Sequence, residues 1–177
     1  EEQIHYLTAI SRQTERLNKL VEELDVLTLN AQPRIESDGE AEIVFLDQLL
    51  IEVMSEFQLL IEREERDIYI QVSPESAKIK SHYDKLSRIL VNLINNAFKY
   101  SDPGTKIEIV AQLTDQILTI SVKDEGRGIA SEDLDKIFKR LYRVETSRNM
   151  KTGGHGLGLA IARELAHQLG GEITVES

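Results

Sequence analysis

The chain is organised around Asn92-Leu93-Ile94-Asn95-Asn96-Ala97-Phe98-Lys99-Tyr100, the end of a longer apolar run that begins at Leu86. The apolar residues recur at helical spacing, so one side of the predicted helix faces a core. Asn92, Asn96 and Lys99 share another face, because they lie four and three residues apart. An amide oxygen is a suitable ligand for Mg²⁺, and a lysine offers a positive charge to phosphate. A solvated polar face would give the same pattern, so the stretch alone leaves both interpretations open.

The composition and net charge of the chain exclude several classes of function. The 177 residues are 41% hydrophobic, enough for one core of ordinary size with a small appendage. The formal net charge of −10 argues against nucleic acid or an anionic membrane as partner, so an anionic ligand would need a local basic patch. The absence of cysteine excludes disulfides, and four scattered histidines do not suggest a histidine metal site. The sequence starts inside an amphipathic pattern and stops just after a strand begins, so we expect a piece of a longer protein.

The first part of the chain differs from the rest. Residues 1–31 repeat apolar side chains in alternating steps of three and four, which is typical of a helix in a coiled coil or bundle. Pro33 and then Ser37-Asp38-Gly39 interrupt this pattern. We therefore expect a long amphipathic bundle helix over residues 1–34, a linker over 35–41 and a second domain over 42–177.

The second domain mixes strand and helix patterns and is predicted to be α+β. Strands are expected over residues 42–46, 67–73, 77–80, 106–113, 116–123 and 172–176, with the fourth and fifth joined as a hairpin at 114–115. Helices are expected from Asp47, as N-cap, to about residue 63, over 86–100 and over 157–169, with a short helix after Ser131.

Two glycine-containing motifs follow the central helix. Asp124-Glu125-Gly126-Arg127-Gly128-Ile129 comes directly after a strand, where glycines let the backbone approach a ligand and a carboxylate lies beside them. Gly153-Gly154-His155-Gly156-Leu157-Gly158-Leu159 opens a helix, whose free N–H groups attract phosphate. A simple glycine turn and an ordinary helix start remain the alternatives. The segment between them is basic, with Lys136, Lys139, Arg140, Arg143, Arg148 and Lys151.

The order and spacing of these motifs resemble the ATP-binding catalytic domain of sensor histidine kinases, members of the GHKL superfamily. Asn92–Tyr100 is similar to the family's N box, and Asp124–Gly128 to its first G box. Residues 137–143 resemble the F box, and 154–159 the second G box. The resemblance implies a Bergerat-type α/β sandwich, a mixed sheet covered by helices on one face, with a truncated C-terminus here. Residues 1–34 resemble the second helix of the family's dimerisation and phosphotransfer hairpin.

The resemblance also implies roles for individual residues. Asn96 would hold the Mg²⁺ of bound ATP, with Asn92 nearby, and Asp124 would accept a hydrogen bond from the adenine amino group. The remaining implied contacts to ATP are Lys99, Tyr100, Gly126, Gly128, Ile129, Arg140, Arg143, Gly154, His155, Gly156, Leu157 and Gly158. We expect no catalytic residue in this chain itself, because no histidine lies in the family's phosphoacceptor context of an acidic neighbour and a following proline.

One position separates the members of the superfamily. Its ATP-hydrolysing members carry a glutamate four residues before the metal-binding asparagine, where this chain has Asn92. An amide cannot act as a base, so the sequence favours a histidine kinase over a hydrolase. The expected partners are ATP, a second kinase subunit in a homodimer and a response-regulator receiver domain, with this region on the cytoplasmic side of a membrane sensor. A GHKL ATPase and a non-catalytic nucleotide-sensing or dimerisation scaffold of the same fold remain as alternatives.

Overall fold

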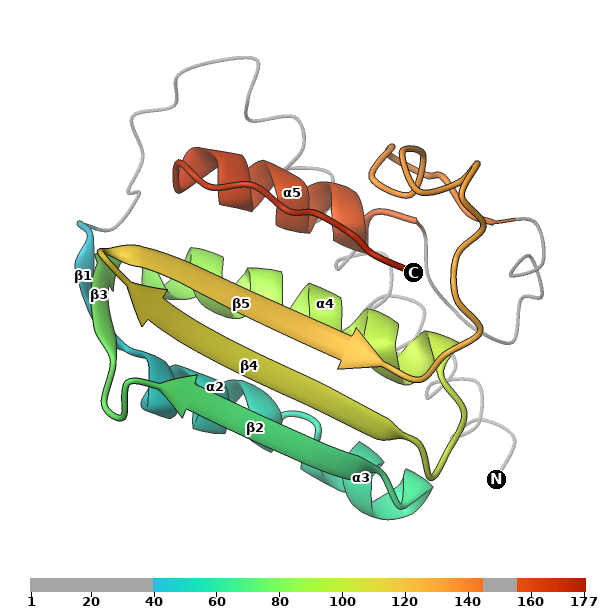
Figure 1. Ribbon diagram of the computed structural model, residues 1–177, viewed down its shortest axis with the longest axis horizontal. Helices are drawn as coiled ribbons and strands as arrows, with labels where there is room; N and C mark the ends of the chain where they lie inside the picture. Colours follow the sequence, from blue (N-terminus) through green and yellow to red (C-terminus); the bar gives the residue numbers. More distant parts are fainter. Residues whose placement is uncertain (1–39, 145–155) are drawn as a thin grey trace, which may run out of the picture. The chain divides into compact units, whose positions relative to one another are not determined.

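The computed structural model describes residues 40–144 and 156–177 (Figure 1). Their elements, in chain order, are β1 (Glu42–Phe45), α2 (Leu46–Ser55), α3 (Gln58–Glu64), β2 (Asp67–Ser73), β3 (Lys78–Ser81), α4 (Tyr83–Tyr100), β4 (Lys106–Thr114), β5 (Ile117–Asp124) and α5 (Gly158–Gln168). The predicted bundle helix over residues 1–34 lies outside the described residues, as does most of the predicted linker.

The sheet is mixed, as expected. Strands β2, β4 and β5 lie in that order, with β2 parallel and β5 antiparallel to the central β4. Ile109 of β4 is opposite Ile70 on one side and Val122 on the other, so the alternating apolar residues of all three strands share a face. β1 and β3 pair separately as a short antiparallel ribbon, and α4 provides part of the crossover that a parallel β2–β4 pair requires.

Helices cover one face of this sheet. Figure 1 shows α2, α3 and α4 behind the three strands, and α5 packs against α4. Leu90 and Ile94 of α4 are fully buried, as are Ile107 and Ile109 of β4 and Leu49 of α2. Burying each such side chain contributes about 1.5–3 kcal/mol to the stability of the fold. The apolar side of α4 is therefore at the centre of the core. Its other face is thereby left for the polar residues.

The helix predicted from Asp47 to about residue 63 is wrong in two respects. It is broken between α2 and α3, because the Phe57 side chain turns inward and stacks on Phe98 of α4, with ring centroids 5.4 Å apart and planes 7° apart. Asp47 is not the N-cap but lies in the first turn, where its carboxylate accepts a hydrogen bond from the Gln48 N–H. The Leu46 N–H at the helix start instead donates to the carbonyl of Ala77, at 2.9 Å.

Three further predictions needed correction. The short helix after Ser131 is a succession of turns, bonded for example from the Asp133 N–H to the Ala130 carbonyl. Residues 172–177 form no strand, since they make no backbone ladder with any described strand. The hairpin turn is at Asp115 and Gln116, one residue later than expected; both have positive φ, of 50° and 68°. That conformation matches the twist of a tight hairpin.

None of the helices within residues 40–144 and 156–177 is long and apolar enough to cross a membrane.

Candidate functional site

The polar face of α4 is the base of the candidate site. The Asn92 amide nitrogen donates to the Arg88 carbonyl at 2.8 Å, which fixes its side chain along the helix. The amide nitrogen of Asn96, one turn further on, is buried and has no hydrogen-bond partner among the described residues. A buried donor without a partner costs about 1–3 kcal/mol. Such a donor is a reason to expect a ligand at this point of the helix.

The turn after β5 meets the C-terminal end of α4. Asp124 ends β5, and its Oδ1 accepts a hydrogen bond from the Gly126 N–H at 2.8 Å. A Cβ on Gly126 would lie 2.5 Å from the carbonyl oxygen of Tyr100, so no residue larger than glycine fits without a shift. The Arg127 N–H donates to the same carbonyl at 3.4 Å. The turn therefore brings an exposed carboxylate close to the last residue of the helix.

Two positive charges lie close to the ring of Tyr100. The Lys99 ammonium is 5.0 Å from the ring centroid and the Arg127 guanidinium 5.2 Å from it. Lys99 and Tyr100 were predicted from the sequence as site residues, and Arg127 was not. The signal for Arg127 was a basic residue between the two glycines of the motif, in a chain whose formal net charge is −10.

The start of α5 meets the middle of α4. A Cβ on Gly158, the first residue of α5, would lie 2.8 Å from the Asn92 amide oxygen. Gly156 has a φ of +72°, and its carbonyl accepts a hydrogen bond from the Leu141 N–H at 2.9 Å. Among the described residues no side chain caps the first turn of α5, so within this part of the chain its N–H groups are left to solvent or a ligand. Leu157 is 2% exposed, so any contact that it makes with a ligand comes from its backbone.

The segment between β5 and α5 is anchored at its described end. Ile137 and Phe138 are buried, and Arg163 of α5 donates to the Phe138 carbonyl at 3.2 Å. Buried Asp133 accepts a hydrogen bond from the Tyr142 hydroxyl at 2.7 Å. Arg140, which is exposed, and Arg143 follow these anchors. Gly154 and His155 lie outside the described residues, so their predicted contacts remain predictions.

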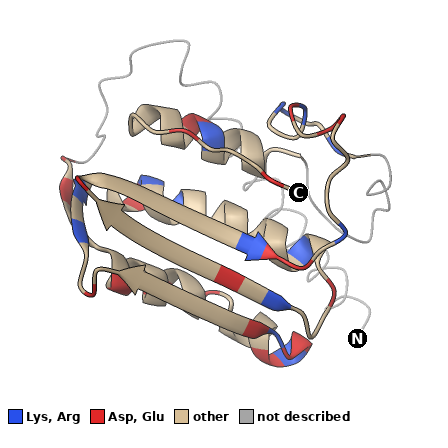
Figure 2. Ribbon diagram, in the orientation of Figure 1, with Lys and Arg blue, Asp and Glu red and all other residues tan. Residues whose placement is uncertain are grey.

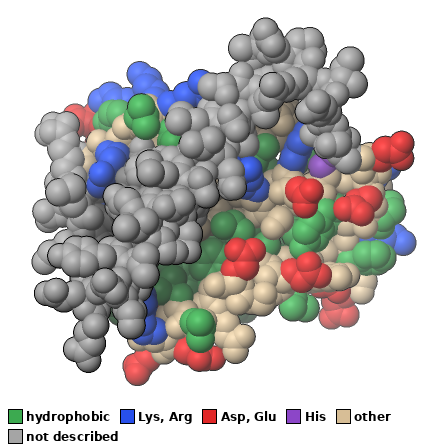
Figure 3. All heavy atoms as spheres, turned by 180° about the vertical axis from the view of Figure 1, so that it is seen from behind, with side chains coloured by type: hydrophobic (Ala, Val, Ile, Leu, Met, Phe, Trp, Pro, Cys, Tyr) green, Lys and Arg blue, Asp and Glu red, His purple; other side chains and the backbone are tan. Residues whose placement is uncertain are grey.

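Charge is distributed unevenly around these elements. Figure 2 shows Lys and Arg at the C-terminal ends of α4 and β5, where Lys99 and Lys123 lie at the same end of the sheet. Viewed from behind, the described part of the surface shows separate acidic side chains scattered among hydrophobic and other side chains (Figure 3), in keeping with the net charge of −10. Because the acidic residues Asp124 and Glu125 directly follow Lys123, basic and acidic side chains lie together at this end of the sheet.

The described residues bring part of the predicted site together. Asn92 lies against Gly158, Tyr100 lies against Gly126 beside Asp124, and Asn96 lies between these two points on α4. Asn92 and Tyr100 are eight positions apart, about 12 Å along a helix. Ile129 is half-buried, its N–H donating to the Ser177 hydroxyl at 2.6 Å, and Gly128 has a φ of +69°.

Comparison with known proteins identifies relatives of the chain. The family described as "Histidine kinase-, DNA gyrase B-, and HSP90-like ATPase" matches residues 81–177. The histidine protein kinase SaeS of Staphylococcus epidermidis is 41% identical over 138 residues, 77% of this chain and 39% of that protein. SaeS of Staphylococcus aureus is 38% identical over 169 residues, 94% of this chain and 47% of that protein. The chain thus spans less than half the length of these curated relatives.

A solved structure has a similar fold. Full-length ShkA in complex with AMPPNP superposes with a TM-score of 0.80 at 26% identity, covering 96% of this chain and 35% of that one.

Proposed function

The chain belongs to the family of histidine kinase-, DNA gyrase B- and HSP90-like ATPases, and from this premise we propose that it is the ATP-binding kinase core of a two-component sensor histidine kinase. It binds Mg-ATP and presents the γ-phosphate to a histidine outside this chain, for onward transfer to a response-regulator aspartate. The similarity to SaeS, a histidine protein kinase, supports this assignment within the family.

One observation carries the proposal: α4 contacts both glycine motifs along a single face. Tyr100 at its end abuts Gly126, while Asn92 two turns earlier abuts Gly158. A nucleoside triphosphate is long enough to extend between these two contacts, with its base at one end and its phosphates at the other. The similar structure of full-length ShkA is a complex with the ATP analogue AMPPNP, which supports nucleotide binding.

The adenine end is assigned to the turn after β5. Asp124 is the last residue of β5, and only one of its carboxylate oxygens is used by the Gly126 N–H among the hydrogen bonds found. The other oxygen would accept a hydrogen bond from the adenine amino group. The close approach of Gly126 to Tyr100 would let backbone, instead of side chains, border the base.

The phosphate end is assigned to the start of α5 and the middle of α4. The uncapped first turn of α5 would direct N–H groups at phosphate oxygens, and Lys99, Arg140 and Arg143 would offset their charge. Gly154, Gly156 and Gly158 would keep side chains away from this point. His155 and Leu157 would line the same loop.

Asn96 is the proposed Mg²⁺ ligand. Its amide oxygen is a hard ligand of the kind that Mg²⁺ prefers, while its buried amide nitrogen, which has no partner among the described residues, needs an acceptor such as a nucleotide oxygen. Among the described residues there is no group of three or more His, Cys, Asp or Glu side chains that could hold a metal. This fits Mg²⁺, which usually keeps several waters and is shared between one or two protein ligands and the substrate phosphates. The ion would neutralise phosphate charge during transfer.

Transfer to histidine is favoured over hydrolysis by Asn92. Its amide nitrogen donates to the Arg88 carbonyl, and its amide oxygen faces Gly158. Neither atom can remove a proton from water, so the position that carries the base in hydrolysing relatives is inert here.

The phosphoacceptor is proposed to lie outside this chain. None of its four histidines has the acidic neighbour and following proline that the phosphoacceptor sequence requires. The chain alone is therefore expected not to phosphorylate itself. A homodimeric parent protein, a response-regulator partner and a cytoplasmic location beside a membrane sensor segment are further parts of the proposal, and they are supported by the family resemblance alone.

Labelled ATP tests this proposal directly. The chain would be incubated with γ-labelled ATP and Mg²⁺, first alone and then with a separate phosphoacceptor hairpin carrying a histidine. We expect acid-labile label on the hairpin only. Label on the chain itself would contradict the missing phosphoacceptor, and steady release of free phosphate without transfer would point to an ATPase instead.

A further inference from the structure

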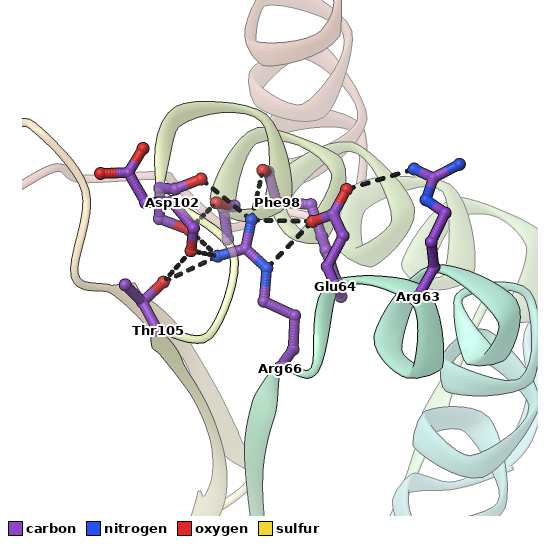
Figure 4. A network of polar contacts seen from close by, with 8 residues as sticks. Arg63, Glu64, Arg66, Phe98, Asp102 and Thr105 are labelled. Atoms are coloured by element: carbon purple, nitrogen blue, oxygen red, sulfur yellow. Dashed lines mark hydrogen bonds and ion pairs between the residues drawn. The ribbon is translucent and has the colours of Figure 1, made fainter.

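A buried arginine lies at the junction of α3 and β2. Arg66 is 6% exposed, and it is the only Lys or Arg that is buried within the described ranges 40–144 and 156–177. An ionised group so far from water is costly unless its donors are satisfied. Figure 4 shows the guanidinium of Arg66 among polar atoms contributed by several segments.

The acceptors of Arg66 are mainly at the C-terminal end of α4. Nη2 donates to the carbonyls of Phe98, at 3.0 Å, and Ser101, at 2.9 Å. Nη1 donates to the Ser101 hydroxyl, the Thr105 hydroxyl and the carbonyl of Asp102. The last carbonyls of a helix have no partners within it and form the negative end of its dipole. Arg66 therefore caps α4 from outside the helix.

The orientation of the guanidinium is fixed on its other sides. Glu64 accepts from Nε at 3.1 Å and from Nη2 at 2.9 Å. The guanidinium carbon lies 5.3 Å from the ring centroid of Phe98, the residue that also stacks on Phe57. The planar guanidinium is thus held by hydrogen bonds along its edges and by the Phe98 ring on one face, which fixes its orientation. The ammonium of a lysine could not make the same set of contacts.

The same turn of α4 contacts the proposed adenine site. Arg66 holds the carbonyls of Phe98 and Ser101, while the carbonyl of Tyr100 between them faces Gly126 and accepts from the Arg127 N–H. The approach of the turn after β5 to α4 leaves no space for a Cβ, so a shift of this last turn would displace Tyr100 and open the contact. The position of the turn is thus set from two sides.

We propose that Arg66 is a positioning residue for the nucleotide, which it never contacts. By holding the last turn of α4, it keeps Tyr100, and Asn96 one turn earlier, where the base and the phosphates are bound. This inference rests on the proposed function, because it concerns the same site. A purely structural arginine would stabilise the fold without changing the affinity of the folded protein for nucleotide.

Calorimetric titration of the whole chain with Mg-ADP separates these roles. Loss of stability reduces the number of binding-competent molecules, whereas loss of positioning raises the Kd of those that are folded. For Arg66→Met we expect a Kd at least about tenfold higher, the effect of misaligning one hydrogen bond to a charged group. Arg66→Lys, which keeps the charge but not the fork, should give a smaller increase. If Arg66→Met does not fold, the Kd of Arg66→Lys tests the proposal in its place.

Two control variants complete the experiment. Arg63→Met removes a nearby arginine whose side chain is 72% exposed and contacts only the carboxylate of Glu64 among the bonds found, so its Kd should equal that of the wild type. Val44→Ala weakens the core from β1, at the opposite end of the sheet in Figure 1, and should lower the melting temperature with little change in Kd. A wild-type Kd in folded Arg66→Met or Arg66→Lys would overturn the inference alone. Absence of binding by the wild type would overturn the proposed function and this inference with it.

Discussion

Replacing Asp124 by asparagine removes one acceptor from the proposed adenine contact and changes little else. In the wild-type protein the Gly126 N–H donates to Oδ1 of Asp124 at 2.8 Å, and the amide oxygen of asparagine can keep that bond. The other oxygen becomes an NH₂ group, which would face the adenine amino group as donor against donor. A hydrogen bond to a charged group contributes about 1.5–3 kcal/mol. Because Asp124 is exposed, the lower end of that range applies, and we expect Kd to rise at least about tenfold.

Glu125→Gln is the matched control for Asp124→Asn. It removes the same charge one residue away, from an exposed side chain whose Oε2 accepts only the Lys106 N–H among the bonds found. Both variants would be titrated calorimetrically with Mg-ADP at one ionic strength. A tenfold loss in the first and none in the second indicates a specific contact. Equal losses would indicate a general charge effect, and unchanged affinity in Asp124→Asn would refute the assignment of adenine to this turn.

Three other substitutions test separate parts of the structure. Gly158→Ala would bring a Cβ within 2.8 Å of the Asn92 amide oxygen, and should weaken Mg-ADP binding at least about tenfold in a calorimetric titration. Tyr142→Phe would remove the bond to buried Asp133, and urea unfolding should show a loss of about 1–3 kcal/mol. The hydrogen bond from the Tyr83 hydroxyl to Glu52 of α2 raises the pKa of Tyr83 from 10.0 to about 12. The stability that this hydrogen bond gives the folded protein is therefore fully present below pH 10 and is lost as the pH rises through about 12. Alkaline absorbance titration should show one tyrosine ionising near pH 12 that is absent in Tyr83→Phe.

Each of these substitutions has its own control. Gly171→Ala places a Cβ 3.6 Å from the nearest carbonyl oxygen, an ordinary contact, so it should bind nucleotide normally. Tyr69→Phe removes an exposed hydroxyl bonded to Gln71 at 3.1 Å and should cost much less stability than Tyr142→Phe; equal losses would contradict the role of the buried carboxylate. Glu52→Gln should return the Tyr83 ionisation towards pH 10, and no change would exclude that carboxylate as the cause.

The sheet and the central helix were predictable because each depends on a local pattern. Period-two alternation predicted β2 over Asp67–Ser73 correctly, and the helical period of the apolar residues predicted the C-terminal part of α4. The side of α4 on which the polar residues lie has the same cause. Once α4 buries its apolar face, Asn92, Asn96 and Tyr100 lie on another face, and Gly158 and Gly126 approach the first and last of them.

The features that were missed depend on contacts between distant segments. The break at Phe57 exists because its ring stacks on Phe98, a contact that no local pattern encodes. Arg66 lies in the charged run Arg63-Glu64-Glu65-Arg66-Asp67, which by sequence is typical of a solvated surface. Its burial follows only when α4 ends beside it and the loop after α4 supplies acceptors. A contact between distant segments also explains why Asp47 is not the N-cap: the N–H at the start of α2, that of Leu46, donates to the backbone carbonyl of Ala77.

The bundle helix over residues 1–34 and the contacts of Gly154 and His155 stay predictions, because they lie outside the described residues. Substitutions in the described part of the site do not depend on them.

The central claim is that this chain binds ATP through Mg²⁺ on the polar face of α4. The most direct measurement is a calorimetric titration of ADP and a non-hydrolysable ATP analogue into the chain, with Mg²⁺ and with a chelator. The account predicts binding at one site that is much weaker without the metal and much weaker again in Asn96→Ala. Absence of binding, or binding that is indifferent to both the metal and Asn96, would contradict it.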